Sequence, residues 1–348
     1  VKVSMNYRFA SLEDRVTFTP SQHRRTLQRL CSDTLRPDYT SRGQVMETRQ
    51  LGTDGPQVSR ICFGAWPIGG GMGTVEDQQA IEAVEAAVEV GMTFIDTAES
   101  YVASERLIGK AISGKRDQVF LATKVSGKDH SREHIEQALD ASFQALGTDY
   151  MDLYQLHSPQ PQWPIDETMD VLSRLRDQGK IRYIGISNYS AEQTAEVIKY
   201  GSIHSSQPLY NMLNREAEES ILPVCLANGI GVIPHSVLAK GHLSGRYQPG
   251  HTFDADDERS EFASFTRDGM KRVIEVTSKL ALWSQDHGRD MIQLAIAWAL
   301  AQPSITSPIV GAKSVEQVIH NAKAADWKLS GSDLAEIDDI LGGIVVDR

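Results

Sequence analysis

The chain has 348 residues, with 35 Lys and Arg against 46 Asp and Glu, and a formal net charge of -11. This acidic balance disfavours nucleic-acid or anionic-membrane binding, and no apolar run approaches the roughly 20 residues that a transmembrane helix needs. Cys31, Cys62 and Cys225 are too scattered for a disulfide framework or a metal-ligand spacing, which favours a reducing, cytoplasmic location.

The first 45 residues differ from the rest in charge. They carry eight basic and four acidic residues and contain no apolar core of a signal peptide. The acidic residues also argue against a transit peptide. We expect residues 1–45 to be a poorly ordered extension and residues 46–348, which begin at Met46, to form one domain.

Strand-like segments begin directly after Met46. Residues 47–51 and 57–60 flank Thr53-Asp54-Gly55-Pro56, which predicts a β-hairpin. Eight short and nearly continuous apolar runs follow, as expected for strands buried on both faces of a parallel sheet. They are residues 59–64, 93–97, 119–125, 151–157, 181–187, 205–209, 231–235 and 307–311.

Helical patterns with recognisable ends separate these runs. Thr74-x-x-Asp77 is expected to begin one helix and Gly91 to end it, and Ser131 to begin another. Ser190-x-x-Gln193 and Ser314-x-x-Gln317 both have the pattern of a capping box.

Eight strand–helix units favour a (β/α)8 TIM barrel, with a doubly wound sheet as the alternative. The N-terminal hairpin is then expected to cap the floor of the barrel. The long spacing after the seventh run predicts a polar loop at residues 245–266 and extra helices over about residues 268–301.

Polar residues stand at the carboxyl ends of three consecutive predicted strands, where barrel enzymes carry their chemistry. Asp96 ends the second run and leads to Tyr101, Lys124 lies near the end of the third, and His157 ends the fourth. Singly, each has a structural explanation, as an ion pair, a core histidine or a packed tyrosine. Because all four converge on one rim, a shared catalytic role is the better interpretation. A lysine beside one His and one Asp is not a metal-ligand set, so no metal is expected.

This group suits the reduction of a carbonyl. The alkoxide that forms when hydride arrives needs a proton donor, and a phenol with a pKa of about 10 is a poor donor at neutral pH. A nearby cation, Lys124, lowers the pKa of Tyr101, and Asp96 holds Lys124 charged and in place. His157 can hydrogen-bond the carbonyl oxygen or help to relay the proton.

The sequence resembles the aldo-keto reductase superfamily. The resemblance rests on Asp96-Thr97-Ala98-Glu99-Ser100-Tyr101 with the following Leu107-Ile108-Gly109, on Ala122-Thr123-Lys124 and on Leu153-Tyr154-Gln155-Leu156-His157, and it extends from about Met46 to the C-terminus. It implies that Asp96, Tyr101, Lys124 and His157 form the catalytic tetrad, and that Trp66, Tyr101 and His157 contact the substrate. Val102 departs from the family, which usually has Gly after the Tyr.

The resemblance also implies a nicotinamide cofactor. Ser187, Asn188 and Gln207 match the contacts to the carboxamide, and the segment from His235 to Gly241 matches the one that stacks on the nicotinamide and wraps the pyrophosphate. His235 and Val237 replace the usual aromatic residue and proline. The full expected set of cofactor contacts is Gly64, Trp66, Asp96, Ser187, Asn188, Gln207, His235, Ser236, Leu238, Lys240, Gly241, Gly311, Lys313, Gln317 and Asn321.

The eighth run ends at Gly311-Ala312-Lys313-Ser314 and leads into a helix. Free N–H groups at a helix start, together with a lysine, favour an anion. In the family this segment holds the adenosine 2′-phosphate, so the resemblance implies NADPH rather than NADH. Gln317 stands where many relatives have Arg, and His320 replaces a frequent Glu.

The glycine-rich segment Gly69-Gly70-Gly71-Met72-Gly73 imitates a Rossmann fingerprint, because it precedes a helix and an acidic residue. Its spacing fails, since Thr74 occupies the third glycine position. It is better interpreted as the first barrel loop. Together with Trp66, the loop containing Trp163 and the segment after Gly245, it is expected to line the substrate pocket.

The sequence therefore predicts an NADPH-dependent reductase of a small aldehyde or ketone, active as a monomer or homo-oligomer. Two other functions fit the same residues. One is an NADP-dependent alcohol or sugar dehydrogenase, which uses the same catalyst in reverse. The other is a regulatory binding protein like the channel-associated subunits of the superfamily. A Rossmann dehydrogenase is a weaker alternative.

Overall fold

The computed structural model describes residues 46–70, 72–247, 251–253, 259 and 262–344. Eight strands form one parallel sheet in the order β10-β3-β4-β5-β6-β7-β8-β9, and each lies within one of the expected apolar runs. They are β3 (Cys62–Gly64), β4 (Phe94–Asp96), β5 (Phe120–Val125), β6 (Met151–Leu156), β7 (Ile181–Ser187), β8 (Ser205–Gln207), β9 (Gly231–Val232) and β10 (Ile309–Gly311).

The sheet closes on itself. The N–H of Ile309, the first residue of β10, donates to the Pro234 carbonyl beyond β9 at 2.9 Å, and Val232 forms a parallel bridge with Ile305. Every strand therefore has a neighbour on each side, and no edge is left for pairing with another chain. The expected (β/α)8 barrel is confirmed, and the doubly wound alternative is wrong.

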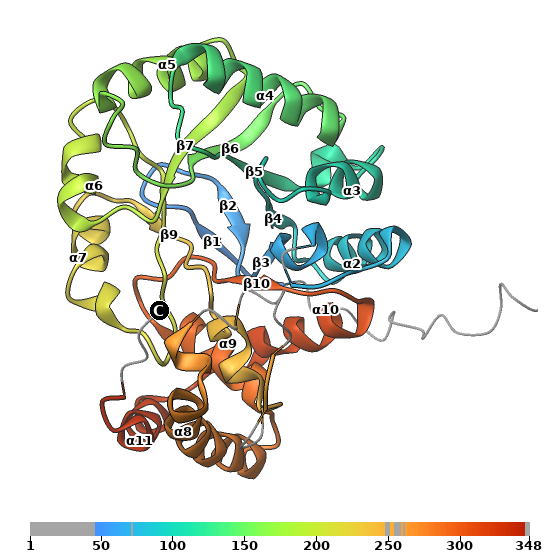
Figure 1. Cartoon of the computed structure of the whole chain (residues 1–348), viewed down its shortest axis with the longest axis vertical. Helices are drawn as coiled ribbons and strands as arrows, with labels where there is room; N and C mark the ends of the chain where they lie inside the picture. The colour runs from blue at the N-terminus through green and yellow to red at the C-terminus, as the bar shows by residue number, and fades with distance from the viewer. Residues whose placement is uncertain (1–45, 71, 248–250, 254–258, 260–261, 345–348) are drawn as a thin grey trace, which may run out of the picture. The chain divides into compact units, whose positions relative to one another are not determined.

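The helices surround the strands (Figure 1). Most of them bury one apolar face, as α2 and α4 do, whereas α9 is apolar and buried on nearly all sides. The helices that follow the strands in turn are α2 (Asp77–Glu89), α3 (Ser104–Ala111), α4 (Arg132–Leu146), α5 (Ile165–Asp177), α6 (Ala191–Val197), α7 (Ile221–Ala227), α9 (Met291–Ala301) and α10 (Val315–Ala322).

Two helix ends differ from the expectation. Helix α2 begins at Asp77 with Glu76 as its N-cap, so Thr74 does not cap it. The Ser314 hydroxyl does cap α10, but the Gln317 side chain accepts a hydrogen bond from the Lys313 N–H instead of completing a capping box. The other two helix starts are as expected, since Ser131 caps α4 and Ser190 forms a capping box with Gln193.

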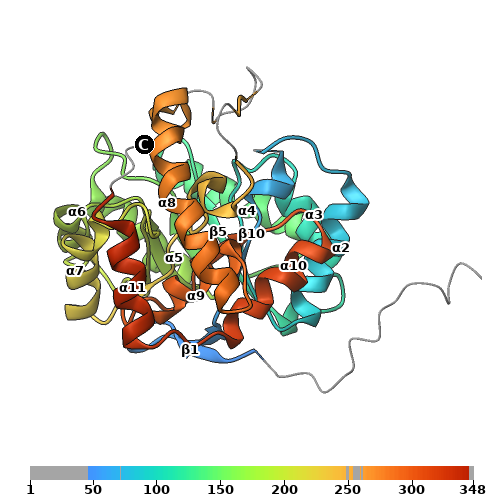
Figure 2. The same ribbon diagram turned by 90° about the horizontal axis from the view of Figure 1, so that it is seen from below.

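A hairpin of β1 (Thr48–Gln50) and β2 (Gln57–Ser59) covers the amino ends of the barrel strands, as expected (Figure 2). Leu51, fully buried, packs in one cluster with Phe94, Leu153 and Ile233. The Thr53 N–H donates to the Gly229 carbonyl at 2.8 Å. The hairpin thereby closes the floor and leaves the carboxyl ends of the strands for the site.

Additional helices follow β9. The chain passes through the short 3-10 helices η4 (Ala239–Ser244) and η6 (Ala263–Phe265) into α8 (Arg267–Asp286), and α11 (Gly331–Leu341) ends the fold. The expected helical stretch is thus two helices, α8 and α9. The predicted extension at residues 1–45 lies outside the described residues, and the start of the domain at Met46 stays a prediction.

Gly109 of α3 marks a close approach between helices. A Cβ there would lie 2.5 Å from the Ala145 carbonyl oxygen of α4. We expect Gly109→Ala to lower the free energy of unfolding by about 1–3 kcal/mol in urea titrations, because backbone atoms cannot move aside cheaply. Gly331→Ala is the control, since a Cβ there meets nothing within 4 Å. Equal unfolding midpoints for the two variants would contradict the packing of α3 against α4.

Candidate active site

Strand alternation selects the side chains that meet at the carboxyl end of the barrel. Residues two apart on a strand point to the same side. Lys124 and Ser126 form one such pair at the end of β5, and Gln155 and His157 form another at the end of β6. The same ends bring Asp96 from β4 and Gln207 from β8 toward them.

A buried ion pair lies at the base of the site. The Lys124 ammonium donates to Asp96 Oδ2 at 2.5 Å, to the Thr97 carbonyl at 2.9 Å and to the Tyr101 hydroxyl at 3.4 Å. These three bonds use all of its hydrogens. Burial alone would lower the pKa of Lys124, but Asp96 and Tyr101 outweigh it and raise the pKa above its ordinary value. Lys124 is therefore a fixed cation.

Amide side chains complete the shell around Asp96. Its Oδ1 accepts hydrogen bonds from Gln155 Nε2 at 2.9 Å and from Gln207 Nε2 at 3.1 Å. The two amides are also joined to each other at 3.1 Å. Because both carboxylate oxygens are hydrogen-bonded, the charge of Asp96 is stabilised although the side chain is buried.

Tyr101 presents its hydroxyl between the cation and the open side of the site. Its ring meets the edges of Trp66, at 4.9 Å between centroids, and of His157, at 5.6 Å. Burial raises the pKa of Tyr101, and Lys124 opposes that rise without overcoming it. The expected lowering of the Tyr101 pKa by Lys124 is therefore outweighed by burial, and the net shift has the opposite direction to the one predicted.

His157 is neutral and anchored on one side. Burial, assisted by the charge of Lys124, lowers its pKa to about 3. Its Nδ1 lies 2.6 Å from the Ser126 hydroxyl, and its carbonyl accepts a hydrogen bond from Asn188 Nδ2 at 2.9 Å. The ring lines the cavity described next, and Nε2 has no hydrogen-bond partner among the described residues.

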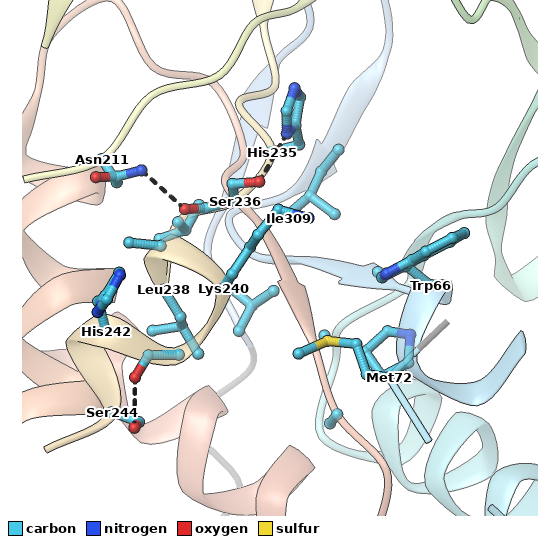
Figure 3. A pocket seen from close by; sticks show the side chains of 18 of the residues that line it. Trp66, Met72, Asn211, His235, Ser236, Leu238, Lys240, His242, Ser244 and Ile309 are labelled. Carbon is cyan, nitrogen blue, oxygen red and sulfur yellow. Dashed lines mark hydrogen bonds between the residues drawn. The ribbon is translucent and has the colours of Figure 1, made fainter. Parts of the chain in front are cut away.

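A cavity of about 1230 Å³ opens above these residues. Asp96, Tyr101 and His157 line it, while Lys124 lies beneath Tyr101 with no exposed surface. All fifteen residues expected to contact a cofactor also line it. Figure 3 shows the segment after β9, from His235 to Lys240, along one wall and Trp66 and Met72 on the other.

Side chains and backbone fix the wall around His235. Its ring nitrogens contact Asn188 Oδ1 at 3.1 Å and Ser236 Oγ at 2.9 Å, and Asn211 Nδ2 donates to the Ser236 carbonyl at 3.0 Å. The His ring is therefore held in one orientation, which suits a stacking surface.

Backbone strain concentrates in the same place. Among the described non-glycine residues, five have a positive φ, and all lie in the cavity wall or beside Tyr101. They are Val102, Asn188, Ser236, Ala239 and Lys240. Such conformations cost on the order of 1–3 kcal/mol each and cluster at functional sites. Val102 adopts at φ 40° a conformation that glycine adopts freely.

Part of the cavity wall suits an anion. Lys240, Arg246, Arg259 and Lys313 are among the residues that line the cavity, in a chain whose net charge is -11. The N-terminus of α10 opens onto the same wall, and its partial positive charge adds to theirs. Asp290 and Glu316 also line the cavity, as does Asp96, whose charge is paired with the buried Lys124. The four cations outnumber these acidic residues, so the donor set fits the phosphates of a dinucleotide.

Several site residues did not emerge from the sequence. The hydrogen bonds of Ser126, Gln155 and the Thr97 carbonyl to the tetrad were missed, although the two-residue alternation from Lys124 and His157 marks the first two. Trp163 was expected in the pocket but does not line the cavity. Its indole N–H donates instead to the Lys128 carbonyl at 2.8 Å.

Two negative findings concern the described residues. No group of three or more His, Cys, Asp or Glu among them is arranged to hold a metal ion. Within the same ranges, no helix has the length and apolar character required to cross a membrane.

Comparison with known proteins identifies the family. The model of the Aldo/keto reductase family matches residues 60–341. The chain belongs to this family. Aldo-keto reductase YhdN of Bacillus subtilis is 37% identical to it, over 87% of this chain and 96% of that protein. An NADH-specific methylglyoxal reductase of Escherichia coli is 34% identical to this chain, over 83% of this chain and 96% of that protein.

Solved structures of related proteins support the same family assignment. A glycerol dehydrogenase from Gluconobacter oxydans superposes with a TM-score of 0.79 at 28% identity, covering 87% of this chain and 97% of that one. A holo-form aldo-keto reductase from Bacillus halodurans superposes with a TM-score of 0.73 at 29% identity, covering 87% of this chain and 99% of that one. This aldo-keto reductase is an oxidoreductase of a family that uses nicotinamide cofactors. The Rossmann alternative is wrong, because the glycine segment belongs to the first barrel loop.

The ion pair gives a stability prediction. Lys124→Met leaves Asp96 buried without its cation, and we expect it to lower the free energy of unfolding by about 3–5 kcal/mol. The double variant Asp96→Asn with Lys124→Met removes both charges and should lose less. Urea unfolding at pH 7 measures both. A double variant less stable than the single one would show that the burial cost of the charges is not the controlling factor.

Proposed function

We propose that this aldo-keto reductase reduces an aldehyde or ketone with NADPH, and that Tyr101 donates the proton. The observation that carries the proposal is the Tyr101 hydroxyl, which lies between the Lys124 cation and the cavity. When bound, the nicotinamide supplies the hydride. The family and its reductase members support carbonyl reduction in general.

Each tetrad residue has a separate task in this proposal. Lys124 stabilises the phenolate that Tyr101 becomes, since the ammonium already contacts its oxygen. Asp96 keeps the ammonium charged and in place. His157 contacts the substrate oxygen, and Trp66 borders the same position against the ring of Tyr101. Proton transfer from a placed acid contributes about 10²–10⁴-fold to a rate.

In this proposal, one part of the cavity wall binds the nicotinamide of the cofactor and another part binds its phosphates. Ser187, Asn188 and Gln207 hold the carboxamide, and His235 stacks on the nicotinamide. The cations in the other part bind the phosphates, with Lys313 at the adenosine 2′-phosphate. Lys313 Nζ is held close to that wall by the Met72 carbonyl. The remaining expected contacts are Gly64, Ser236, Leu238, Lys240, Gly241, Gly311, Gln317 and Asn321.

Replacing Tyr101 tests the proton donor. Tyr101→Phe should lower kcat for carbonyl reduction by about 10²–10⁴-fold and leave NADPH affinity, measured by fluorescence titration, nearly unchanged. Tyr200→Phe is the control, because the hydroxyl of that half-exposed tyrosine donates to Glu196 on the surface. Unchanged turnover in Tyr101→Phe would overturn the assignment.

Replacing Lys313 tests the cofactor preference. Lys313→Met should raise the KM for NADPH by about 10- to 100-fold, the range of a lost hydrogen bond to a charged group, and change the KM for NADH far less. Lys323→Met, at the other end of α10, serves as the control. A wild-type enzyme that prefers NADH, or equal effects on both cofactors, would refute the role of Lys313.

The alternative function, a regulatory binding protein, is also supported by relatives of this chain. A probable voltage-gated potassium channel subunit beta of Oryza sativa is 30% identical, over 81% of this chain and 92% of that protein. A screen of diverse aldehydes and ketones against NADPH and NADH separates the two functions. Turnover of any carbonyl supports the enzyme, and a complete lack of turnover supports the binding protein.

A further inference from the structure

The segment after β9 carries a histidine whose two ring nitrogens both have hydrogen-bond partners. His235 is partly exposed and lines the cavity, and its ring nitrogens lie 3.1 Å from Asn188 Oδ1 and 2.9 Å from Ser236 Oγ (Figure 3). An aromatic residue is usual at this position in the family. Among side chains with a flat ring, only that of histidine can gain a positive charge near neutral pH.

The partners of Asn188 determine which atom of its amide faces the histidine. The His157 carbonyl oxygen carries no hydrogen, so the Asn188 atom that bonds it at 2.9 Å must be Nδ2. The other atom of the amide, Oδ1, accepts hydrogen bonds but cannot donate them. His235 Nε2 therefore carries a hydrogen and donates it to Asn188 Oδ1.

The second ring nitrogen faces a hydroxyl, which adapts to either protonation state. Ser236 Oγ can donate its single hydrogen to an unprotonated Nδ1, or accept one from a protonated Nδ1. This hydroxyl has no other hydrogen-bond partner within the described part of the chain. The imidazolium form of His235 thus keeps both hydrogen bonds, and only the hydroxyl hydrogen has to turn.

Three neighbours of His235, one from each element beside it, are uncharged. Asn188 follows β7, Leu209 forms a parallel bridge with His235 from the segment after β8, and Ser236 is the next residue in the chain. These neighbours leave the ring free to exist in either charge state, because none of them attracts or repels a positive charge strongly.

Titratable groups line the same cavity. Asp96 is paired with the buried Lys124. Burial raises the pKa of Tyr101 and lowers that of His157 to about 3, so both are uncharged near neutral pH. Lys240 is a cation in the same segment as His235. The tetrad thus contributes no net charge, and the charge of a bound ligand acts on His235 directly.

We propose that His235 binds a proton when the reduced cofactor is bound and releases it when the oxidised cofactor is bound, so that acidity selectively weakens the binding of NADP⁺. The inference rests on the proposed function, in which this ring stacks on the nicotinamide. Two stacked positive charges repel each other, whereas the dihydronicotinamide of NADPH is neutral. The neutral imidazole is the form compatible with hydride transfer, since that step leaves the nicotinamide cationic.

Cofactor affinities measured against pH test the proposal. Isothermal titration calorimetry of the full-length enzyme between about pH 8 and about pH 5.5 gives the Kd of NADP⁺ and that of NADPH. The ratio of the first Kd to the second should rise by about 10-fold as the pH falls, because the ordinary pKa of an imidazole, about 6.5, lies one unit above the final pH. Titration of the 2′-phosphate cancels in this ratio. A ratio that does not change with pH overturns the proposal.

Two variants assign the effect to one ring. His235→Phe keeps a flat ring that cannot take up a proton, so the ratio should become independent of pH. His287→Phe is the matched control and should keep the wild-type dependence, because exposed His287 stacks on Trp283 at 3.8 Å and does not line the cavity. A His235→Phe enzyme with the full pH dependence refutes the role of His235.

Nitrogen-15 NMR of histidine-labelled full-length enzyme reports the protons directly, with the His235 signals assigned by their loss in His235→Phe or His235→Gln. The neutral ring should carry its hydrogen on Nε2. At about pH 5.5, Nδ1 should be protonated with saturating NADPH and unprotonated with saturating NADP⁺. Equal protonation in the two complexes contradicts the proposal. Neither measurement depends on turnover, so failure of the Tyr101→Phe test refutes the proposed proton donor and leaves the role of His235 standing.

Discussion

The ion pair between Lys124 and Asp96 is the constraint on which the site depends. Moving two charges into a protein interior costs several kcal/mol per ion. The barrel offsets that cost by giving each ammonium hydrogen an acceptor and each carboxylate oxygen at least one donor. The partners come from β4, β5, β6 and β8, so the pair can exist only where those strand ends converge. Tyr101 is placed by the same requirement, because its hydroxyl takes the third hydrogen of Lys124.

One part of the cavity wall is fixed by hydrogen bonds between neutral side chains, and another part carries cations. At the first, His235, Asn188 and Ser236 fix one another through hydrogen bonds. At the second, charge predominates, with Lys313 beside the start of α10. The segment between them turns through left-handed residues such as Ala239 and Lys240. The stability of the surrounding barrel offsets this strain, which lets the loop follow a ligand closely rather than take its own preferred conformation.

The parts of the structure that follow from repeating patterns could be predicted from the sequence. The eight strands were predictable because continuous apolar runs indicate burial on both faces. The convergence of Asp96, Tyr101, Lys124 and His157 was predictable because strand ends meet on one rim, while their catalytic roles stay a prediction. Features that depend on exact side-chain geometry were not predictable. No feature of the local sequence predicts Glu76 rather than Thr74 as the N-cap of α2. No local feature predicts that the Trp163 indole bonds the Lys128 carbonyl instead of lining the pocket. Ser126 carried a signal in its spacing from Lys124, but its bond to His157 depends on how β5 and β6 end side by side.

The complete burial of Lys124 limits the routes by which protons can reach the active site. All three ammonium hydrogens are bound within the protein, and the side chain has no surface in contact with water. In the proposed reaction, Lys124 therefore has no contact with solvent from which to replace the proton that Tyr101 donates. That proton would have to arrive through the cavity itself, along the path that the substrate uses. The proposed cycle accordingly couples the uptake of one proton from solvent to the exchange of ligands in the cavity.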